Sequence, residues 1–553
     1  MSLFTKIGQL AKQLFGKPAP AAETSAKSIG NKRSSSEANL GDANDKSNKK
    51  FNNKFNRNNK NNKAKPKKDK YKGKKTPFQG QARVYTPKEG VDPNAPKTPR
   101  LPKRKVAVLF GYCGAGYHGL QYNPPSHTIE AELYNAMVKA GAVSEDNAVD
   151  PKKSSLQRAA RTDKGVHAGG NVISMKLIIE DPDIKDKINA CLPEGVRVWN
   201  IQRVCNGFDS KNACSSRIYE YLLPTYALLG PNPDTQLYSD LHDKSKNGDL
   251  DYKDEESDEF FAKYQQMISE NFTAEELQKI KNFEFIKPDD FDQQGSDVRE
   301  VYQLVKKHKS LENSFRRDYR VSTKRLNYLR QVMSQYLGAH NFHNFTLGKD
   351  FKDPSAIRYM KNIKVSDPFV INNTEWVSIK IHGQSFMLHQ IRKMISMATF
   401  IVRCGASKTL IHEAFKADKL NIPKAPALGL LLENPVYSTF NERLNSLGYE
   451  SIDFTHFEKQ MTDFKMRHIY DKIYAEEVKE NVFYAFFGFV DALNKVVDSK
   501  SHENSDKTSC FQYFVTAKKR SEDAEDDVIY TDVKQLKKED AATGAKTSRK
   551  SAD

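Results

Sequence analysis

Apolar and polar positions along the chain fall into blocks that predict its secondary structure. Apolar runs of strand length lie at 106–110, 171–179, 196–201, 218–223, 359–365 and 376–382. Apolar residues recur at helical spacing in 128–140, in a stretch that ends at 337–338, in 386–403 and in 455–495. Strands interleaved with helices in this order predict an α+β fold, with a mixed central sheet and flanking helices.

Two of the expected helices carry more detailed signals. Thr128 is suited to cap the helix at 128–140, and Glu130 and Glu132 favour the same end because acidic groups are stabilised at a helix N-terminus. The helix expected at 386–403 has one apolar face at helical spacing. That face consists of Ile391, Met394, Ile395 and Ala398.

Charge divides the chain into a basic arm and a near-neutral remainder. Residues 1–100 hold 24 Lys and Arg against 7 Asp and Glu, whereas the other 453 residues hold 64 against 63. The arm is rich in Asn, Lys, Ser and Gly, a composition typical of disordered segments. Such an arm suits polyanion binding or nuclear import, and a solvated tail without either role explains it equally well.

The length of 553 residues exceeds what one core usually organises, so several regions are expected. An acidic segment at 240–259, with nine acidic residues against three lysines, opens a polar insertion. The expected regions are a disordered basic arm at 1–100, the first half of a folded domain at 101–227, the acidic and polar insertion at 228–322, the second half of the domain at 323–440, a helical extension at 441–517 and a disordered tail at 518–553.

The cysteines and apolar runs indicate a reduced intracellular compartment. None of the six cysteines forms a C-x-x-C pair, and no apolar run approaches the 18 residues of a membrane span. His340 and His343 could bind a metal, but packing or RNA contact is the favoured reading. A structural zinc site is left open, because the sequence does not place one.

Two basic runs are candidates for a nuclear import signal, at 63–75 and 102–105. An alternative is a mitochondrial presequence at 1–16, where apolar residues recur at roughly helical spacing among lysines with no acidic residue. The absence of arginine from 1–16 counts against this alternative.

The most informative stretch, 161–170, reads Arg-Thr-Asp-Lys-Gly-Val-His-Ala-Gly-Gly. An isolated Asp163 would be read as a turn former, but here Gly165 permits unusual backbone angles and His167 adds a polar edge. Arg161 supplies a cation that shares the face of Asp163 if the chain is extended. A carboxylate presented in this way can act as a nucleophile or a base.

Other residues could complete a site around Asp163. Arg392 lies within an apolar helical pattern, and a buried arginine requires a carboxylate partner, so we predict that Arg392 contacts Asp163. Tyr219 and Tyr221 share one face of the strand at 218–223, either as core or as a platform for a nucleobase. The glycine-rich run 111–119 lacks the Lys-Ser/Thr of a phosphate-binding loop, so we interpret it as a tight turn beside the cleft.

Residues 161–168 resemble the catalytic motif of the TruA-type tRNA pseudouridine synthases. The likeness continues in family order over about 104–440, and its closest fit is the eukaryotic branch, in particular the fungal nuclear enzymes. The matching segments are 111–121, which resembles the first strand and turn, 208–221, which resembles the second active-site strand, 338–346 and 386–392, which resemble later motifs, and 423–430, which resembles the C-terminal one.

The resemblance implies a mixed sheet shared by two similar halves, with a positively charged active-site cleft between them. It also implies isomerisation of uridine to pseudouridine, without a cofactor, by a nuclear and monomeric enzyme. The expected substrates are uridines in and near the anticodon stem and loop of tRNA, with small nuclear RNA and messenger RNA as further ones.

The resemblance assigns the site residues as well. Asp163 is the catalytic carboxylate, and it attacks C1′ or C6 or acts first as a base at C2′. Arg161 fills the vacated base position or holds the everted uridine, Tyr219 stacks on uracil and helps remove the C5 proton, and Arg392 is the counter-ion. The expected substrate-binding residues are Tyr219, Tyr221, Phe208, Lys211, His167 and His118.

One departure from the bacterial pattern lies after Phe208, where Lys211 stands in place of an arginine. A lysine can hold a phosphate, but it lacks the two-pronged geometry of arginine, which leaves the register of the tRNA open. The alternative function is a non-catalytic RNA-binding or RNA-chaperone protein on the same fold.

Overall fold

The computed structural model describes residues 101–491, apart from 149, 248–251 and 284–295. The predicted basic arm, the presequence alternative, the import signal at 63–75 and the tail at 518–553 therefore lie outside the described residues. Within the described part no helix is both long and apolar enough to cross a bilayer.

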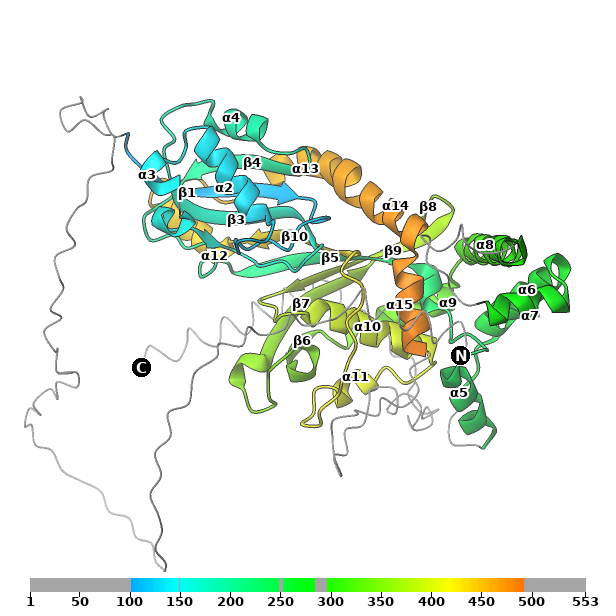
Figure 1. Cartoon of the computed structure of the whole chain (residues 1–553). Coiled ribbons are helices and arrows are strands. Elements are labelled where there is room, and N and C mark those ends of the chain that lie inside the picture. Colours follow the sequence, from blue (N-terminus) through cyan, green and yellow to red (C-terminus); the bar gives the residue numbers. More distant parts are fainter. Residues whose placement is uncertain (1–100, 149, 248–251, 284–295, 492–553) are drawn as a thin grey trace, which may run out of the picture. The chain divides into compact units, whose positions relative to one another are not determined.

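A ten-stranded sheet forms the centre of the fold, in the order β4-β1-β3-β10-β5-β9-β7-β6, with β2 beside β3 and β8 beside β9 (Figure 1). The strands are β1 (Arg104–Tyr112), β2 (Gln157–Arg158), β3 (His167–Leu177), β4 (Val196–Arg203), β5 (Ser216–Pro224), β6 (Gly338–Asn341), β7 (Ile357–Val365), β8 (Phe369–Ile371), β9 (Thr374–Gly383) and β10 (Leu430–Val436). Each apolar run that predicted a strand lies in or overlaps one of these.

The parallel pair of β3 and β10 lies at the middle of the sheet, with Leu431 opposite His167, and all other neighbouring strands run antiparallel. β10 comes from the C-terminal side of the chain but lies between β3 and β5, which come from the N-terminal side. The regions expected at 101–227 and 323–440 therefore interleave in one sheet.

Helices flank the sheet, which confirms the expected α+β class (Figure 1). They are α2 (Ile129–Lys139), α3 (Glu145–Ala148), α4 (Ile184–Cys191), α5 (Gln236–Lys246), α6 (Glu255–Asn271), α7 (Ala274–Asn282), α8 (Ser296–Arg317), α9 (Thr323–Ser334), α10 (Gln390–Arg403), α11 (Leu410–Glu413), α12 (Ser438–Ser446), α13 (Glu458–Phe464), α14 (Asp471–Glu480) and α15 (Val482–Asp491). Thr128 caps α2 as predicted, since its side chain accepts a hydrogen bond from the Ala131 amide.

The helix expected at 386–403 begins four residues later than predicted. His389 has φ +63° and ψ 2°, a left-handed conformation that an α-helix cannot contain, so α10 begins at Gln390. Residues 386–389 form a turn instead. The residues of the predicted apolar face are buried, but so is every other residue of α10, so burial is not limited to one face.

The acidic segment at 240–259 is attached to the folded domain by ion pairs. Arg325 on α9 is buried and pairs with Asp254 and Glu256. Asp254 also caps α6 by accepting a hydrogen bond from the Ser257 amide. Part of the negative charge of the insertion thus neutralises an arginine that would otherwise be buried alone.

The C-terminal helices pack against the central strands. Tyr470 donates a hydrogen bond to the buried Glu220 of β5, and Lys465 forms an ion pair with Glu433 of β10 at 2.6 Å. A β-carbon at Gly170 of β3 would lie 2.7 Å from a ring carbon of Phe454. This close approach leaves no room for a larger residue at position 170.

Replacing Gly170 with alanine is therefore expected to destabilise the protein by about 1–3 kcal/mol, because the added methyl group meets a packed ring and the Glu433 carbonyl rather than a flexible side chain. The free energy of unfolding in urea measures the effect. Gly207→Ala is the matched control, since a β-carbon there meets nothing within 4 Å. Equal stabilities of the two variants would contradict the close packing.

Candidate active site

Asp163 lies on the loop between β2 and β3, and this loop is held in place by the glycine-rich turn that follows β1. The Thr162 carbonyl accepts a hydrogen bond from the Leu120 amide at 3.3 Å, and the Thr162 hydroxyl bonds the Tyr112 hydroxyl at 2.8 Å. Gly119 has φ +93°, and a β-carbon there would lie 2.9 Å from the Thr162 carbonyl oxygen. The prediction of a tight turn at 111–119 agrees with this geometry. The Gly165 amide also donates to the Tyr117 carbonyl at 3.4 Å, so the backbone is held on both sides of Asp163.

The carboxylate of Asp163 is hydrogen-bonded to His389. The distance from His389 Nδ1 to Asp163 Oδ2 is 2.9 Å, and the two side chains are 14% and 27% exposed. Burial by itself would raise the pKa of Asp163. The hydrogen bond and electrostatic interaction with His389, together with the charges of Arg392 and Lys424, outweigh burial, so the pKa of Asp163 lies below its ordinary value. The side chain is therefore ionised at neutral pH.

The predicted contact between Asp163 and Arg392 is wrong. Among the described residues no hydrogen bond or ion pair joins these two side chains, and Arg392 Nε instead donates to the Ala425 carbonyl at 2.6 Å. Arg392 lies about one helical turn after His389. It is His389, the residue just before α10, that forms the hydrogen bond with the carboxylate. Its charge still lowers the pKa of Asp163 from a greater distance.

Tyr219 and Phe386 form an aromatic wall, and Asp163 lies close enough for its charge to act on Tyr219. Their ring centroids lie 5.1 Å apart at an interplanar angle of 78°. Burial raises the pKa of Tyr219 to about 12, so its hydroxyl keeps its proton at neutral pH. Arg217, two residues earlier on the same strand face, donates to the carbonyls of Ala159 and Gln384 and so links the segment before the Asp163 loop to the turn before α10.

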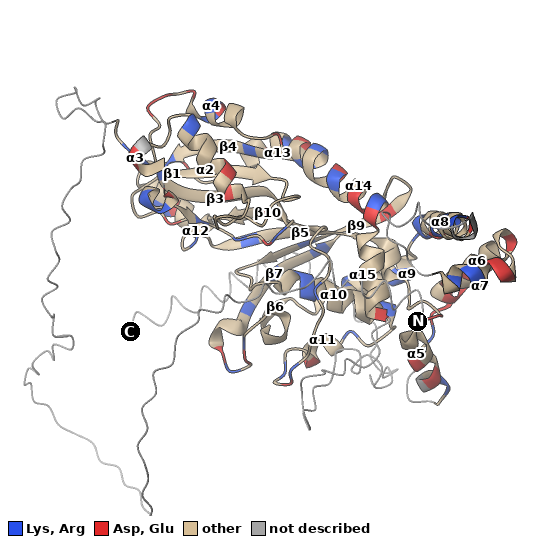
Figure 2. Cartoon of the chain, viewed as in Figure 1, with Lys and Arg blue, Asp and Glu red and all other residues tan. Residues whose placement is uncertain are grey.

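Lys424 completes the positive charge around Asp163. It acts on the carboxylate electrostatically, and burial beside Arg392 lowers the pKa of its own ammonium group. Figure 2 shows Lys and Arg positions on β5, β7 and α10 and acidic positions on α5 to α7.

Sequence reasoning quoted the segments that contain His389 and Lys424 but named neither residue, because spacing does not show which member of a segment reaches the carboxylate.

Three of the predicted substrate-binding residues have almost no exposed surface. Tyr221 and His167 are fully buried, and Phe208 is 2% exposed. Phe208 packs against Tyr437 and Phe440, and the Tyr221 hydroxyl donates to the Pro426 carbonyl at 2.8 Å. Phe208 and Tyr221 are thus already occupied by protein, and we correct their assignment from RNA contact to support of the site. His167 accepts a hydrogen bond from the Gly114 amide at its Nδ1, but among the described residues its Nε2 has no partner. Its ring also lines the hollow beside the catalytic loop, so its assignment stays a prediction.

Among the other predicted binding residues, Tyr219 is buried at 8% exposure, whereas His118 and Lys211 are exposed. Arg161 and His118 lie on the two segments that meet at the Asp163 loop, and Arg161 makes no hydrogen bond or ion pair with the described residues. Lys211 is also exposed, but the neighbouring Ser210 bonds Ser174 on β3. Because a strand rises about 3.3 Å per residue, this places Lys211 roughly 20 Å along β3 from the catalytic loop. Lys211 therefore lies away from the reacting carboxylate.

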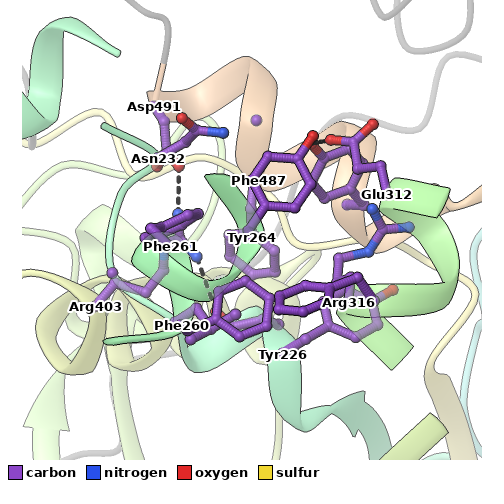
Figure 3. Close-up of a pocket in the computed structure, with 16 residues that line it drawn as sticks. Tyr226, Asn232, Phe260, Phe261, Tyr264, Glu312, Arg316, Arg403, Phe487 and Asp491 are labelled. Carbon is purple, nitrogen blue, oxygen red and sulfur yellow. Dashed lines mark hydrogen bonds and ion pairs between the residues drawn. The ribbon is translucent and has the colours of Figure 1, made fainter. Parts of the chain in front are cut away.

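Two hollows lie near the sheet. The first, of about 510 Å³, opens beside the catalytic loop and is lined by Gly165, Leu428 and Lys472 among others. The second, of about 60 Å³, is shown in Figure 3. Aromatic side chains and Arg316 line it, with the Arg316 guanidinium 3.7 Å from the centre of the Tyr484 ring. None of the residues around Asp163 lines the second hollow. Its lining comes largely from α6 and α8 of the insertion and from α15.

The described residues show no metal centre at the site. Within the described ranges, no group of three or more His, Cys, Asp or Glu is arranged to hold a metal ion. His340 stacks on Phe415 with ring centroids 4.3 Å apart, and His343 is buried. The structure therefore favours packing for both histidines, and it lends no support to a structural zinc within these ranges.

Comparison with known proteins agrees with the class that the fold and the site define. A family model described as tRNA pseudouridine synthase matches residues 332–438. This range contains β6 to β10 and α10, and with them His389, Arg392 and Lys424.

Relatives that match about three quarters of the chain extend the similarity to the segment that contains Asp163. The chain is 60% identical over 415 residues to tRNA pseudouridine synthase 1 of Candida glabrata, covering 74% of this chain and 75% of that protein. It is 56% identical over 433 residues to tRNA pseudouridine synthase 1 of Saccharomyces cerevisiae, covering 76% and 78%. A second Saccharomyces cerevisiae protein, tRNA pseudouridine(27/28) synthase, is 39% identical over 383 residues, covering 68% and 97%. The chain belongs to the tRNA pseudouridine synthase family and is an isomerase.

Proposed function

We propose that this enzyme isomerises specific uridines of tRNA to pseudouridine, with Asp163 as its catalytic carboxylate. The N1–C1′ bond of the nucleoside breaks and a C5–C1′ bond forms, while C5 loses a proton and N1 gains one. The observation that carries the proposal is the ionised, partly exposed carboxylate beside an aromatic wall, on a loop that the protein holds at both ends.

The remaining site residues receive roles that match their positions. Arg161 is exposed and makes no bond to the described protein, so it is free to hold the everted uridine or fill the space that the base leaves. Tyr219 offers its ring as a stacking surface. Because its hydroxyl keeps its proton at neutral pH, it can accept the C5 proton only by giving up its own, and we therefore assign Tyr219 chiefly to stacking.

Replacing Asp163 with asparagine is expected to abolish pseudouridine formation and leave RNA binding intact, because asparagine keeps the shape of the side chain and removes its negative charge. Single-turnover assays on a uridine-containing tRNA transcript measure the first effect, and filter binding measures the second. Asp186→Asn, on α4, is the control, because Asp186 is 73% exposed and lies outside the site.

Turnover that survives Asp163→Asn would contradict the assigned role. RNA binding by the native protein with no isomerisation at all would instead support the alternative, a non-catalytic RNA-binding or RNA-chaperone protein.

The proposed targets are uridines in and near the anticodon stem and loop of tRNA, with small nuclear RNA and messenger RNA as further substrates. The name of one relative, tRNA pseudouridine(27/28) synthase, supports the tRNA part. Pseudouridine mapping of total RNA, with and without the gene for this chain, is expected to show losses at such tRNA positions. A map that changes only outside tRNA would contradict this assignment.

We propose that the enzyme works in the nucleus as a monomer and that residues 63–75 direct its import. The other basic run, 102–105, is a poorer candidate because Arg104 and Lys105 already belong to β1. Replacing the lysines of 63–75 with alanine is expected to move a fluorescent fusion of the full chain out of the nucleus, and deleting 1–16 to leave it there. A mitochondrial signal that depends on residues 1–16 would favour the presequence alternative.

A further inference from the structure

The side chain that meets the catalytic carboxylate in this structure belongs to His389, to which sequence reasoning gave no role. An ionised carboxylate can only accept hydrogen bonds, so the proton in the 2.9 Å contact must lie on His389 Nδ1. The contact uses Asp163 Oδ2. Within the described residues no side-chain hydrogen bond occupies Oδ1, which leaves that oxygen available to the nucleoside.

The backbone of His389 is held in a conformation that places its ring against Asp163. Its φ of +63° is left-handed, a conformation that is strained for a residue other than glycine. The surrounding turn is held by several bonds, because the Thr346 hydroxyl donates to the Leu388 carbonyl and the Met387 amide donates to the Gln390 side chain, both at 2.9 Å. Strain that is held in place by its neighbours is characteristic of functional positions.

A buried lysine holds the segment to which this turn is bonded. Lys393 on α10 donates to the carbonyls of Asn344 and Thr346, at 3.1 and 3.3 Å. The bond to Lys393 fixes the backbone of Thr346, and the Thr346 hydroxyl in turn bonds the Leu388 carbonyl. The position of the His389 ring is therefore set by α10 and by the 344–346 segment together, not by a freely moving loop.

Arg392 serves a different purpose in this geometry. Its Nε donates to the Ala425 carbonyl, and the Ala425 amide donates back to the Arg392 carbonyl at 3.2 Å. This reciprocal pair ties α10 to the segment that carries Lys424. Arg392 thus supplies charge and fixes a neighbouring segment, while the orienting hydrogen bond comes from His389.

We propose that His389 is a positioning residue of the isomerisation, which holds Asp163 Oδ2 through its Nδ1 proton so that Oδ1 faces the reacting nucleoside. This inference rests on the proposed function of Asp163. It assigns the orientation of the carboxylate to the left-handed residue before α10 rather than to the arginine within that helix.

Three substitutions separate the side chain of His389 from its backbone. Asparagine tolerates a left-handed conformation and places an amide N–H near the position of Nδ1. Glycine also tolerates that conformation but has no donor. His389→Gln carries its amide one bond further out, near the position of Nε2, and so tests whether the donor must be at Nδ1.

Single-turnover rates are expected to fall on the order of 100-fold in His389→Gly, as they do when one positioned donor is lost from an active site. The fall in His389→Asn should be within about tenfold, and His389→Gln should lie nearer to glycine than to asparagine. Asn372→Gly is the matched control: Asn372 is a left-handed residue with φ +50° in the turn between β8 and β9, and its replacement should leave the rate unchanged.

The pH profile provides a readout that a purely structural role would not move. His389 lowers the pKa of Asp163, so its removal raises that pKa, and less of the carboxylate is ionised at acidic pH. The acid limb of the rate profile should therefore move to higher pH in His389→Gly, and by less in His389→Asn. The ratio of native to variant rate should grow as the pH falls.

The outcomes distinguish this inference from the function on which it rests. If Asp163→Asn is inactive but His389→Gly keeps its rate within about threefold and an unchanged pH profile, the positioning role is wrong and the function stands. If His389→Gly and His389→Asn lose the same activity at every pH, the positioning role is also wrong, because the N–H donor that asparagine restores made no difference. Turnover in Asp163→Asn would overturn the function itself. Melting temperatures and RNA affinities of all variants establish that each one is folded and binds substrate.

Discussion

The site depends on keeping one partly buried carboxylate ionised and still. Burial around Asp163 works against its negative charge, and the protein offsets this with a hydrogen bond from His389 and with the charges of Arg392 and Lys424. The offset has to come from several groups, because a base that leaves its stack to enter the site removes still more water from the carboxylate. A single exposed counter-ion would be screened by solvent and would not fix the side-chain rotamer.

These groups meet because four neighbouring strands contribute to one region of the sheet. Asp163 precedes β3, Lys424 precedes β10, Tyr219 lies on β5, and the turn with His389 follows β9. In the sheet these strands are adjacent, in the order β3-β10-β5-β9. The insertion of β10 between two strands from the first half of the chain is what brings the C-terminal segment with Lys424 to the Asp163 loop.

Six of the ten strands were predictable because they coincide with apolar runs, although β7 is mostly exposed and the largely buried β10 was not predicted. The start of α10 was not, because apolar periodicity continues through 386–389 although the backbone there does not remain helical. The partner of Asp163 was not predictable either. Arg392 was chosen because a buried arginine requires a carboxylate partner, and the spacing of three residues gave no reason to consider His389 instead.

Family likeness identified the positions around the site better than it identified what each position touches. Asp163 and Arg161 lie where a nucleoside could reach them, whereas Phe208 and Tyr221 belong to the same motifs and are covered by protein. A motif residue that supports a loop from behind is as tightly constrained as one that meets the substrate. Only the three-dimensional arrangement separates the two kinds.

The C-terminal helices contribute to the site from the opposite face of the sheet. Tyr219 and Glu220 are adjacent on β5, so their side chains point to opposite faces. On one face Tyr219 meets Phe386 beside the carboxylate, and on the other Glu220 accepts hydrogen bonds from Tyr470 and Ser378. Because Glu220 is buried, loss of those donors would leave its charge unsatisfied and loosen the strand that carries Tyr219. The extension beyond β10 is thus part of what holds the aromatic wall in register with Asp163, even though none of its residues lies in that wall.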